Sequence, residues 1–109
     1  MDNEYVLVIN DVEYHFRLKS QKIVNLEKIY GKNIFEIVQE MSFNSMTDFI
    51  GASLISPANI NKYDLMDILM EKYSLREISD NIMTQIAVKS GLIKQADLDN
   101  ALEAEEIKN

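Results

Sequence analysis

The chain has 109 residues, no cysteine and a formal net charge of -7, and 47% of its residues are hydrophobic. This length and composition are typical of one domain with its own core, so we expect residues 1–109 to form a single domain. The lack of cysteine excludes disulfides, thiolate metal sites and cysteine nucleophiles, and the acidic charge disfavours direct binding to nucleic acid.

The N-terminal residues favour a protein that is neither exported nor embedded in a membrane. Asp2 and Glu4 lie where a signal peptide needs positive charge. Apolar runs in the chain stay well short of the roughly 20 residues that a membrane span requires. We therefore expect a soluble, cytoplasmic protein with no membrane partner.

Residues 1–18 predict one β-hairpin. Asn10 and Asp11 form a two-residue turn between runs rich in β-branched and aromatic residues. This turn pairs the strands residue by residue, and side chains on a strand alternate between its two faces. Six side chains then share one face, which we interpret as the core face: Tyr5, Leu7, Ile9, Val12, Tyr14 and Phe16.

The opposite face of the hairpin is partly apolar. Val6 and Val8 lie on it, and the pairing places His15 opposite Val6. A lone hairpin is marginal in water, so its core face must rest on the rest of the chain. Its outer face and its two edges then remain open. We interpret Val6, Val8 and His15 as a candidate self-association face.

Residues 19–91 change to helical spacing, and we expect four to six helices in an α+β fold. Ser20 predicts the start of a first helix, which ends near Tyr30 with Gly31 in the left-handed position that follows a helix. Its expected buried residues are Ile23, Leu26 or Val24, Ile29 and Tyr30.

The next two helices are also predicted from capping residues. Asn33 and Glu36 form a capping box for a helix from Ile34 to about Met41. Phe35 and Val38 are expected on its buried side, with Ile34 and Met41 as further candidates. Ser45 and Asp48 predict the start of another helix, with an apolar stripe made of Met46, Phe49, Ile50 and Leu54.

That third helix is expected to pack closely and to end before a proline. Small residues at Gly51, Ala52 and Ser53 favour close helix packing over a ligand role. Ser56 precedes Pro57, and a residue before proline avoids the helical region.

The remaining helices are also predicted from capping residues. Asn61 and Asp64 predict a helix to about Tyr73. Ser74 and Glu77 form a capping box for a long helix that ends at Gly91. Residues 92–109 form an acidic segment that we expect to begin as a helix and to fray. Its apolar anchors are Leu92, Ile93, Ala96, Leu98, Ala101, Leu102 and Ile107.

The chain carries no recognisable set of catalytic, cofactor-binding or metal-binding residues. His15 is the single histidine, and on an exposed hairpin beside Asp11 and Glu13 it is more typical of a surface residue than of a metal ligand. The sequence contains none of the common phosphate-binding, zinc-protease or serine-hydrolase motifs. We therefore expect a protein that is not an enzyme and needs no cofactor.

Several methionines lie in the helical part, and they have two interpretations. Met66, Met70 and Met83 occupy predicted helices. Methionine suits adaptable apolar surfaces that bind helical partners, so these three form a candidate client-binding surface. The more common role of methionine is to fill a core, and both readings stay open.

The N-terminal third of the chain resembles a known family. A hairpin with an Asn-Asp turn and the second strand Val12–Leu18 leads into a helix with the sequence SQKIVNLEKIY, followed by Gly31-Lys32-Asn33. This arrangement resembles the small tail assembly chaperones of long-tailed bacteriophages and prophages of Gram-positive bacteria. The resemblance covers Tyr5 to Asn33, and beyond it extends to length, acidity and helix content.

This resemblance implies a non-enzymatic role. Such chaperones self-associate and coat the long helical tape-measure protein before the tail tube forms around it. The expected partners are further copies of the chain and the tape-measure protein or another tail protein, with no nucleic acid. The acidic charge leaves an alternative open, a small regulatory binding protein such as a DNA-mimic or an antitoxin-like inhibitor.

Overall fold

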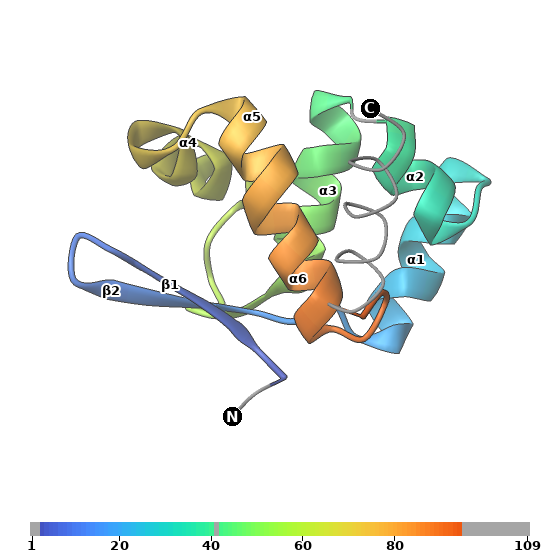
Figure 1. The fold of residues 1–109 in the computed structure, drawn as a ribbon, viewed down its shortest axis with the longest axis horizontal. Coiled ribbons are helices and arrows are strands. Elements are labelled where there is room, and N and C mark those ends of the chain that lie inside the picture. Colours follow the sequence, from blue (N-terminus) through green and yellow to red (C-terminus); the bar gives the residue numbers. More distant parts are fainter. Residues whose placement is uncertain (1–2, 41, 95–109) are drawn as a thin grey trace, which may run out of the picture.

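A computed structural model describes residues 3–40 and 42–94 of the chain. Its three strands form one antiparallel sheet in the order β1 (Tyr5–Ile9), β2 (Val12–Phe16) and β3 (Leu54–Ser56). The helices lie on one side of the β1–β2 hairpin (Figure 1). The fold is α+β with an N-terminal hairpin, as the sequence predicts.

The hairpin has the predicted turn and register. Asn10 and Asp11 adopt positive φ angles of 51° and 66°, as the two central residues of a type I′ turn require. The five strand pairs run from Tyr5 opposite Phe16 to Ile9 opposite Val12. The sequence could predict this register because the length and type of the turn alone determine which residues pair across the hairpin.

The predicted core face of the hairpin is correct except at its tip. Leu7, Ile9, Tyr14 and Phe16 are all buried, and Phe16 is 0% exposed. Val12 is 41% exposed, so its assignment to the core is wrong. The turn end of the hairpin projects past the helices, and Val12 therefore has too few neighbours to cover it (Figure 1).

A short third strand replaces the predicted end of the third helix. Helix α3 (Phe43–Ser53) ends at Ser53, and Leu54 pairs with Phe16 instead of extending the helical stripe. Ser56 pairs with His15, which leaves Ile55 as an extra residue in β3. The unpaired edge of β2 supplies hydrogen bonds that the sequence pattern of residues 54–56 does not reveal.

Five helical segments follow the hairpin in the described part of the chain, within the predicted number. The last segment is continuous, with a π-helical stretch in its middle. The bounds are α1 (Ser20–Tyr30), α2 (Ile34–Glu40), α3 (Phe43–Ser53), α4 (Lys62–Lys72), and finally α5 (Leu75–Glu77), η1 (Ile78–Met83) and α6 (Thr84–Lys89).

Most predicted helix ends are confirmed. Gly31 has a φ of 65° and ends α1, and its N–H donates to the carbonyl of Glu27. The capping boxes that begin α2 and α5 are both present. The predicted start of α3 at Ser45 is wrong, because the Ser42 hydroxyl accepts the Ser45 N–H and the helix begins earlier.

The start of α1 also differs in detail. Lys19 holds the N-cap position and Ser20 is the first helical residue, with no side-chain cap.

Two exposed apolar residues show where periodicity was misleading. Ile29 is 72% exposed and Phe35 is 53% exposed, although both were expected to be buried. On α2 the buried pair is Ile34 and Ile37. Of the expected pair, Val38 is partly buried against the core, so the prediction fails at Phe35 alone. Met41 lies outside the described residues.

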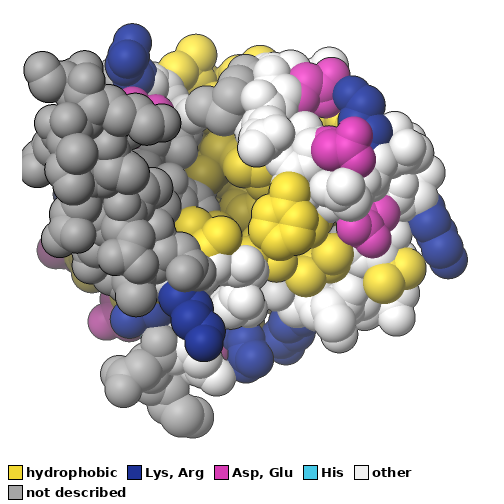
Figure 2. All heavy atoms as spheres, turned by 45° about the vertical axis from the view of Figure 1, so that its right-hand side comes forward, with side chains coloured by type: hydrophobic (Ala, Val, Ile, Leu, Met, Phe, Trp, Pro, Cys, Tyr) yellow, Lys and Arg dark blue, Asp and Glu magenta, His cyan; other side chains and the backbone are white. Residues whose placement is uncertain are grey.

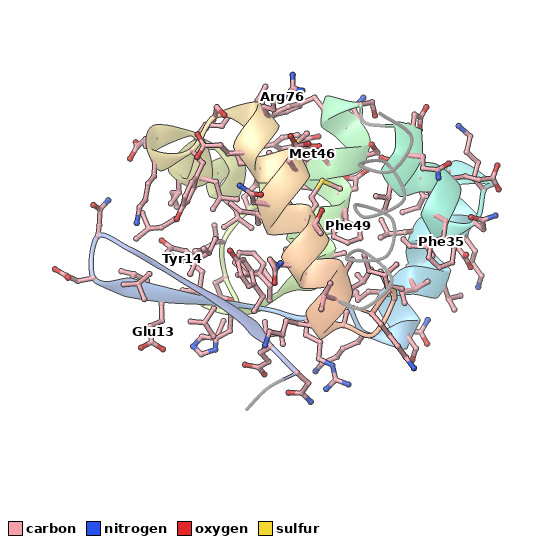
Figure 3. All side chains as sticks on the ribbon, in the orientation of Figure 1. Glu13, Tyr14, Phe35, Met46, Phe49 and Arg76 are labelled. Atoms are coloured by element: carbon pink, nitrogen blue, oxygen red, sulfur yellow. The ribbon has the colours of Figure 1, made fainter. Side chains whose placement is uncertain are left out.

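The core lies between α3, α4 and the continuous segment made of α5, η1 and α6, which we call the long C-terminal helix. Phe49 and Ile50 of α3 are both 0% exposed. Figure 3 shows Phe49 and Met46 projecting from α3 into the interior of the helical layer. Helix α4 and the segment formed by η1 and α6 contribute regularly spaced buried residues, namely Leu65, Met66, Leu69, Ile78, Ile82, Met83 and Ile86.

A network of polar side chains links α1, α3 and α4. The Tyr30 hydroxyl of α1 donates to Asp48 Oδ2 of α3 at 2.5 Å, and Lys62 Nζ of α4 lies 2.6 Å from Asp48 Oδ1. Burial of Tyr30, together with its hydrogen bond to Asp48, raises the pKa of the tyrosine hydroxyl. Asp48 therefore links helices, and it is not the capping residue that its position suggested.

The end of the described chain corrects one further prediction. Leu92 and Ile93 form a bend after α6, so the C-terminal segment does not continue as a helix from residue 92. Residues 95–109, where fraying was predicted, lie outside the described residues.

Gly51 confirms the predicted close packing of α3. A Cβ atom at this position would lie 2.7 Å from Lys62 Cβ, which is closer than side-chain carbons approach in folded proteins. The first turn of α4 therefore packs directly against the backbone of α3.

We expect Gly51→Ala to destabilise the fold by roughly 1–3 kcal/mol, because the added methyl forces α3 and α4 apart. Urea unfolding followed by circular dichroism measures this change. The same substitution in a Lys62→Gly background should cost clearly less, since the opposing Cβ is then gone. An equal cost in both backgrounds would contradict the contact.

Candidate interaction surfaces

The outer face of the hairpin is open, as predicted. Val6 is 42% exposed and Val8 is 52% exposed. Tyr14 points toward the helices, whereas its neighbour Glu13 points away from them (Figure 3). Among the described residues, no element covers this outer side of the hairpin (Figure 1).

The same two valines also line an open sheet edge. β3 pairs with β2, so the outer edge of β1 has no partner strand within residues 3–40 and 42–94. In an antiparallel hairpin with a two-residue turn, Val6 and Val8 occupy the non-hydrogen-bonded positions, and their backbone groups point to this edge. Lys72 Nζ donates to the Val8 carbonyl at 3.2 Å, near the hairpin tip. The exposed valine side chains and the open backbone edge thus lie along the same strand, β1.

His15 is held between two carboxylates on this face. Its Nδ1 lies 3.0 Å from Glu4 Oε1, and its Nε2 lies 3.0 Å from Glu13 Oε1. The hydrogen bond to Glu4, followed by that to Glu13, raises the pKa of the imidazole. Only the protonated ring donates to both carboxylates at once. Strand alternation puts these three side chains on one face, and the structure brings them into contact.

The three candidate client-binding methionines do not form one surface. Met66 is 1% exposed and packs in the core, which matches the alternative reading of methionine as core filler. Met70 is partly buried against the same core. Met83 is 3% exposed, yet its side chain reaches the wall of a surface groove. Met83 is therefore the member of the set that lies at a concave surface.

An apolar hollow of about 850 Å³ lies between α2 and the long C-terminal helix. Hydrophobic side chains gather around a depression on this side of the molecule (Figure 2). Its walls come from α2, from η1 and α6, and from the bend that follows α6. The lining residues are Ile34, Phe35, Val38, Gln39, Arg76, Ser79, Asp80, Met83, Thr84, Ala87, Leu92 and Ile93.

A second hollow of about 410 Å³ continues this surface toward α3 and α5. Both hollows are lined by Arg76, Ser79 and Asp80, so they adjoin each other, and we call the two together the α2–α6 groove. The second hollow adds Phe43, Met46 and Leu75 to the lining. The groove therefore includes one exposed apolar residue in each hollow, Phe35 in the larger and Leu75 in the smaller.

The groove carries little net charge. Arg76 Nε and Asp80 Oδ2 lie 3.5 Å apart, and they are the two charged residues in the described lining. Asp80 and Ser79 belong to the π-helical stretch, a rare geometry that is frequent at functional sites. The chemistry of the groove favours an apolar ligand with few charges.

Sequence reasoning missed this groove. Phe35 and Val38 were assigned to the core, and Leu92 and Ile93 were assigned to a frayed helix. The signal that was present is the number of apolar residues on α2, because a short helix with Ile34, Phe35, Ile37 and Val38 cannot bury all four, and Phe35 stays exposed. The partner wall on α6 depends on tertiary packing and leaves no local signal.

The described residues show no features of a metal site or a membrane span. Within residues 3–40 and 42–94, no group of three or more histidine or acidic side chains is placed to hold a metal ion. None of the helices in those ranges has the length and apolarity needed to cross a bilayer.

Comparisons with known proteins give no assignment. No family model, curated protein or solved structure matches the chain. The hypotheses about function therefore depend on the two surfaces described above and on the sequence resemblance.

We expect the imidazole of His15 to titrate above its usual pKa of about 6.5. A raised folded-state pKa means that this contribution to stability is fully present below about pH 6.5 and is lost as the pH rises through the folded pKa. NMR of the single histidine measures the titration directly. Glu4→Gln should lower the pKa toward 6.5. A wild-type pKa at or below that value would contradict the paired arrangement.

Proposed function

We propose that this chain is a non-enzymatic tail assembly chaperone of a long-tailed bacteriophage or prophage. It self-associates and binds the helical tape-measure protein in the cytoplasm of the bacterial host. The observation that carries the proposal is the outer surface of β1, where exposed Val6 and Val8 lie beside an open strand edge. This surface belongs to the segment from Tyr5 to Asn33 that resembles the chaperone family.

Self-association through β1 has a clear physical basis. A second copy can add its own β1 to the open edge, where its backbone would pair with that of Val6 and would replace Lys72 at the Val8 carbonyl. Val6 and Val8 would lie beside the side chains on the same face of the added strand, and each such cross-strand apolar pair contributes roughly 0.2–1 kcal/mol. Hydrogen bonds would set the register, and the valines would favour association.

Client binding requires a different surface, and the α2–α6 groove is the candidate. A tape-measure protein is a long helix, and an amphipathic helix binds by laying its apolar face in an apolar groove. The groove offers Phe35, Val38 and Met83 for such contacts. Among the methionines proposed from the sequence, Met83 alone retains a role in the proposed client binding.

We expect the double variant Val6→Lys with Val8→Lys to lower the oligomer mass measured by light scattering. Two lysines on this face place like charges opposite each other across the interface and keep the valine positions in water. Circular dichroism should show an intact fold, because both positions are about half exposed.

The matched control is Val24→Lys with Ile29→Lys, which adds the same charge to exposed apolar positions of α1. This control should keep the wild-type mass. If the hairpin variant also keeps the wild-type mass, the proposed interface is wrong.

A second candidate function follows from the net charge of -7, namely a small acidic regulator of the DNA-mimic or antitoxin-like class. Such a protein would bind one basic partner, and the affinity would fall steeply with salt. Binding of a tape-measure helix in the apolar groove should change little between about 0.1 M and 1 M NaCl, where the Debye length falls from about 10 Å to 3 Å. Calorimetric titration with a tape-measure segment measures this difference. A steep salt dependence would favour the acidic regulator.

A further inference from the structure

We propose that the α2–α6 groove is the binding site for residues 95–109 of the same chain. The groove is an apolar feature that a folded protein in water should cover. Its described walls leave Phe35 53% exposed and Leu75 44% exposed. The proposal concerns the occupant of this groove in the free protein, so it goes beyond the chaperone function.

The path of the chain delivers this segment to the groove. Leu92 and Ile93 turn away from the end of α6 and line the groove themselves. The Leu92 N–H donates to the Ala87 carbonyl at 2.9 Å, which holds the bend against α6. The described chain reaches Lys94 directly after these lining residues, so the next residues begin at one end of the groove. No long linker is needed, and the local concentration of the segment is high.

The length of the segment matches the length of the groove. The groove follows the long helix from Ala87 back to Leu75, which are 12 residues apart. At about 1.5 Å per residue this corresponds to roughly 18 Å. Residues 95–109 number 15, and as a helix they would extend about 22 Å. The segment is therefore long enough to reach the second hollow near Phe43.

The sequence of the segment fits an apolar groove. Leu98, Ala101 and Leu102 have the spacing of one helical face. Asp99 and Glu103 fall on a different side of such a helix, where they can stay in water. Because Arg76 and Asp80 already pair with each other, the described groove has no unpaired charge that would attract those carboxylates. The apolar face is the part of the segment that the groove can bind.

This occupant has a consequence for binding, which rests on the proposed chaperone function. A client helix that uses the same groove must displace residues 95–109, so the segment lowers the affinity for weak or incorrect ligands. Partner binding and segment release would then be coupled.

Engineered disulfides test the proposal in the full chain. The protein has no cysteine, so each introduced pair reacts without background. Val38→Cys on α2 is combined with Leu98→Cys or with Leu102→Cys. The matched control is Val24→Cys on α1 with the same partners, because Val24 is exposed and does not line the groove. Mild oxidation is followed on non-reducing gels and by mass spectrometry.

At least one Val38 pair should form an intramolecular disulfide about tenfold faster than its Val24 control, because docking raises the effective concentration. Equal rates for the Val38 and Val24 pairs would overturn the proposal. Disulfide-linked dimers from the Val38 pairs would also overturn it, since the groove would then hold the segment of a second copy.

A hydrophobic dye gives an independent readout. Leu98→Gln with Leu102→Gln should raise the fluorescence of the dye 8-anilinonaphthalene-1-sulfonate by severalfold, because the groove is uncovered. The control Asp99→Gln with Glu103→Gln should leave the fluorescence near the wild-type value. Unchanged fluorescence in the leucine variant would overturn the proposal. These outcomes do not depend on the light-scattering result, so failure here and failure of the hairpin interface are separate.

Discussion

The apolar face of the N-terminal hairpin must be covered, because two strands joined by a turn are marginal on their own in water. Phe16 is fully buried at the end of this face that lies away from the turn. As the chain leaves β2, the Arg17 N–H donates to the Ser53 carbonyl at 2.8 Å, and the Leu18 N–H donates to Ser90 Oγ at 2.7 Å. The C-terminal ends of α3 and α6 are thus both hydrogen-bonded to the residues that directly follow β2. The remaining helices pack around α3 and α6.

Coverage from one side leaves the opposite side of the hairpin open. The helices bury Leu7 and Tyr14, and the same geometry turns Val6 and Val8 outward. The α2–α6 groove lies in the helical layer, and Phe35 on its α2 wall is far from the hairpin tip (Figure 3). A protein with this arrangement can associate through its sheet while a different surface binds or protects a helix. That separation is what an assembly chaperone needs, since oligomer contacts and client contacts must coexist.

The candidate site was only partly predictable from the sequence. The exposed valines and the neighbouring His15 followed from the strand period, which has one outcome once the turn is known. The groove did not follow, because its two walls are about 45 residues apart in the chain and neither wall is distinctive alone. Met66 and Met83 occupy similar helical patterns, yet one fills the core and the other reaches the groove. Their different surroundings result from packing and not from their own spacing.

By itself the sequence determined the features that depend on a few neighbouring residues. These are the type I′ turn at Asn10 and Asp11, the strand register, and the capping boxes that begin α2 and α5. The tertiary structure decided which apolar residues of α2 face inward, and it drew residues 54–56 into the sheet. The physical reason is that turns and caps satisfy backbone groups locally. Helix orientation and edge pairing are chosen by the partner surface, which lies far away in the chain.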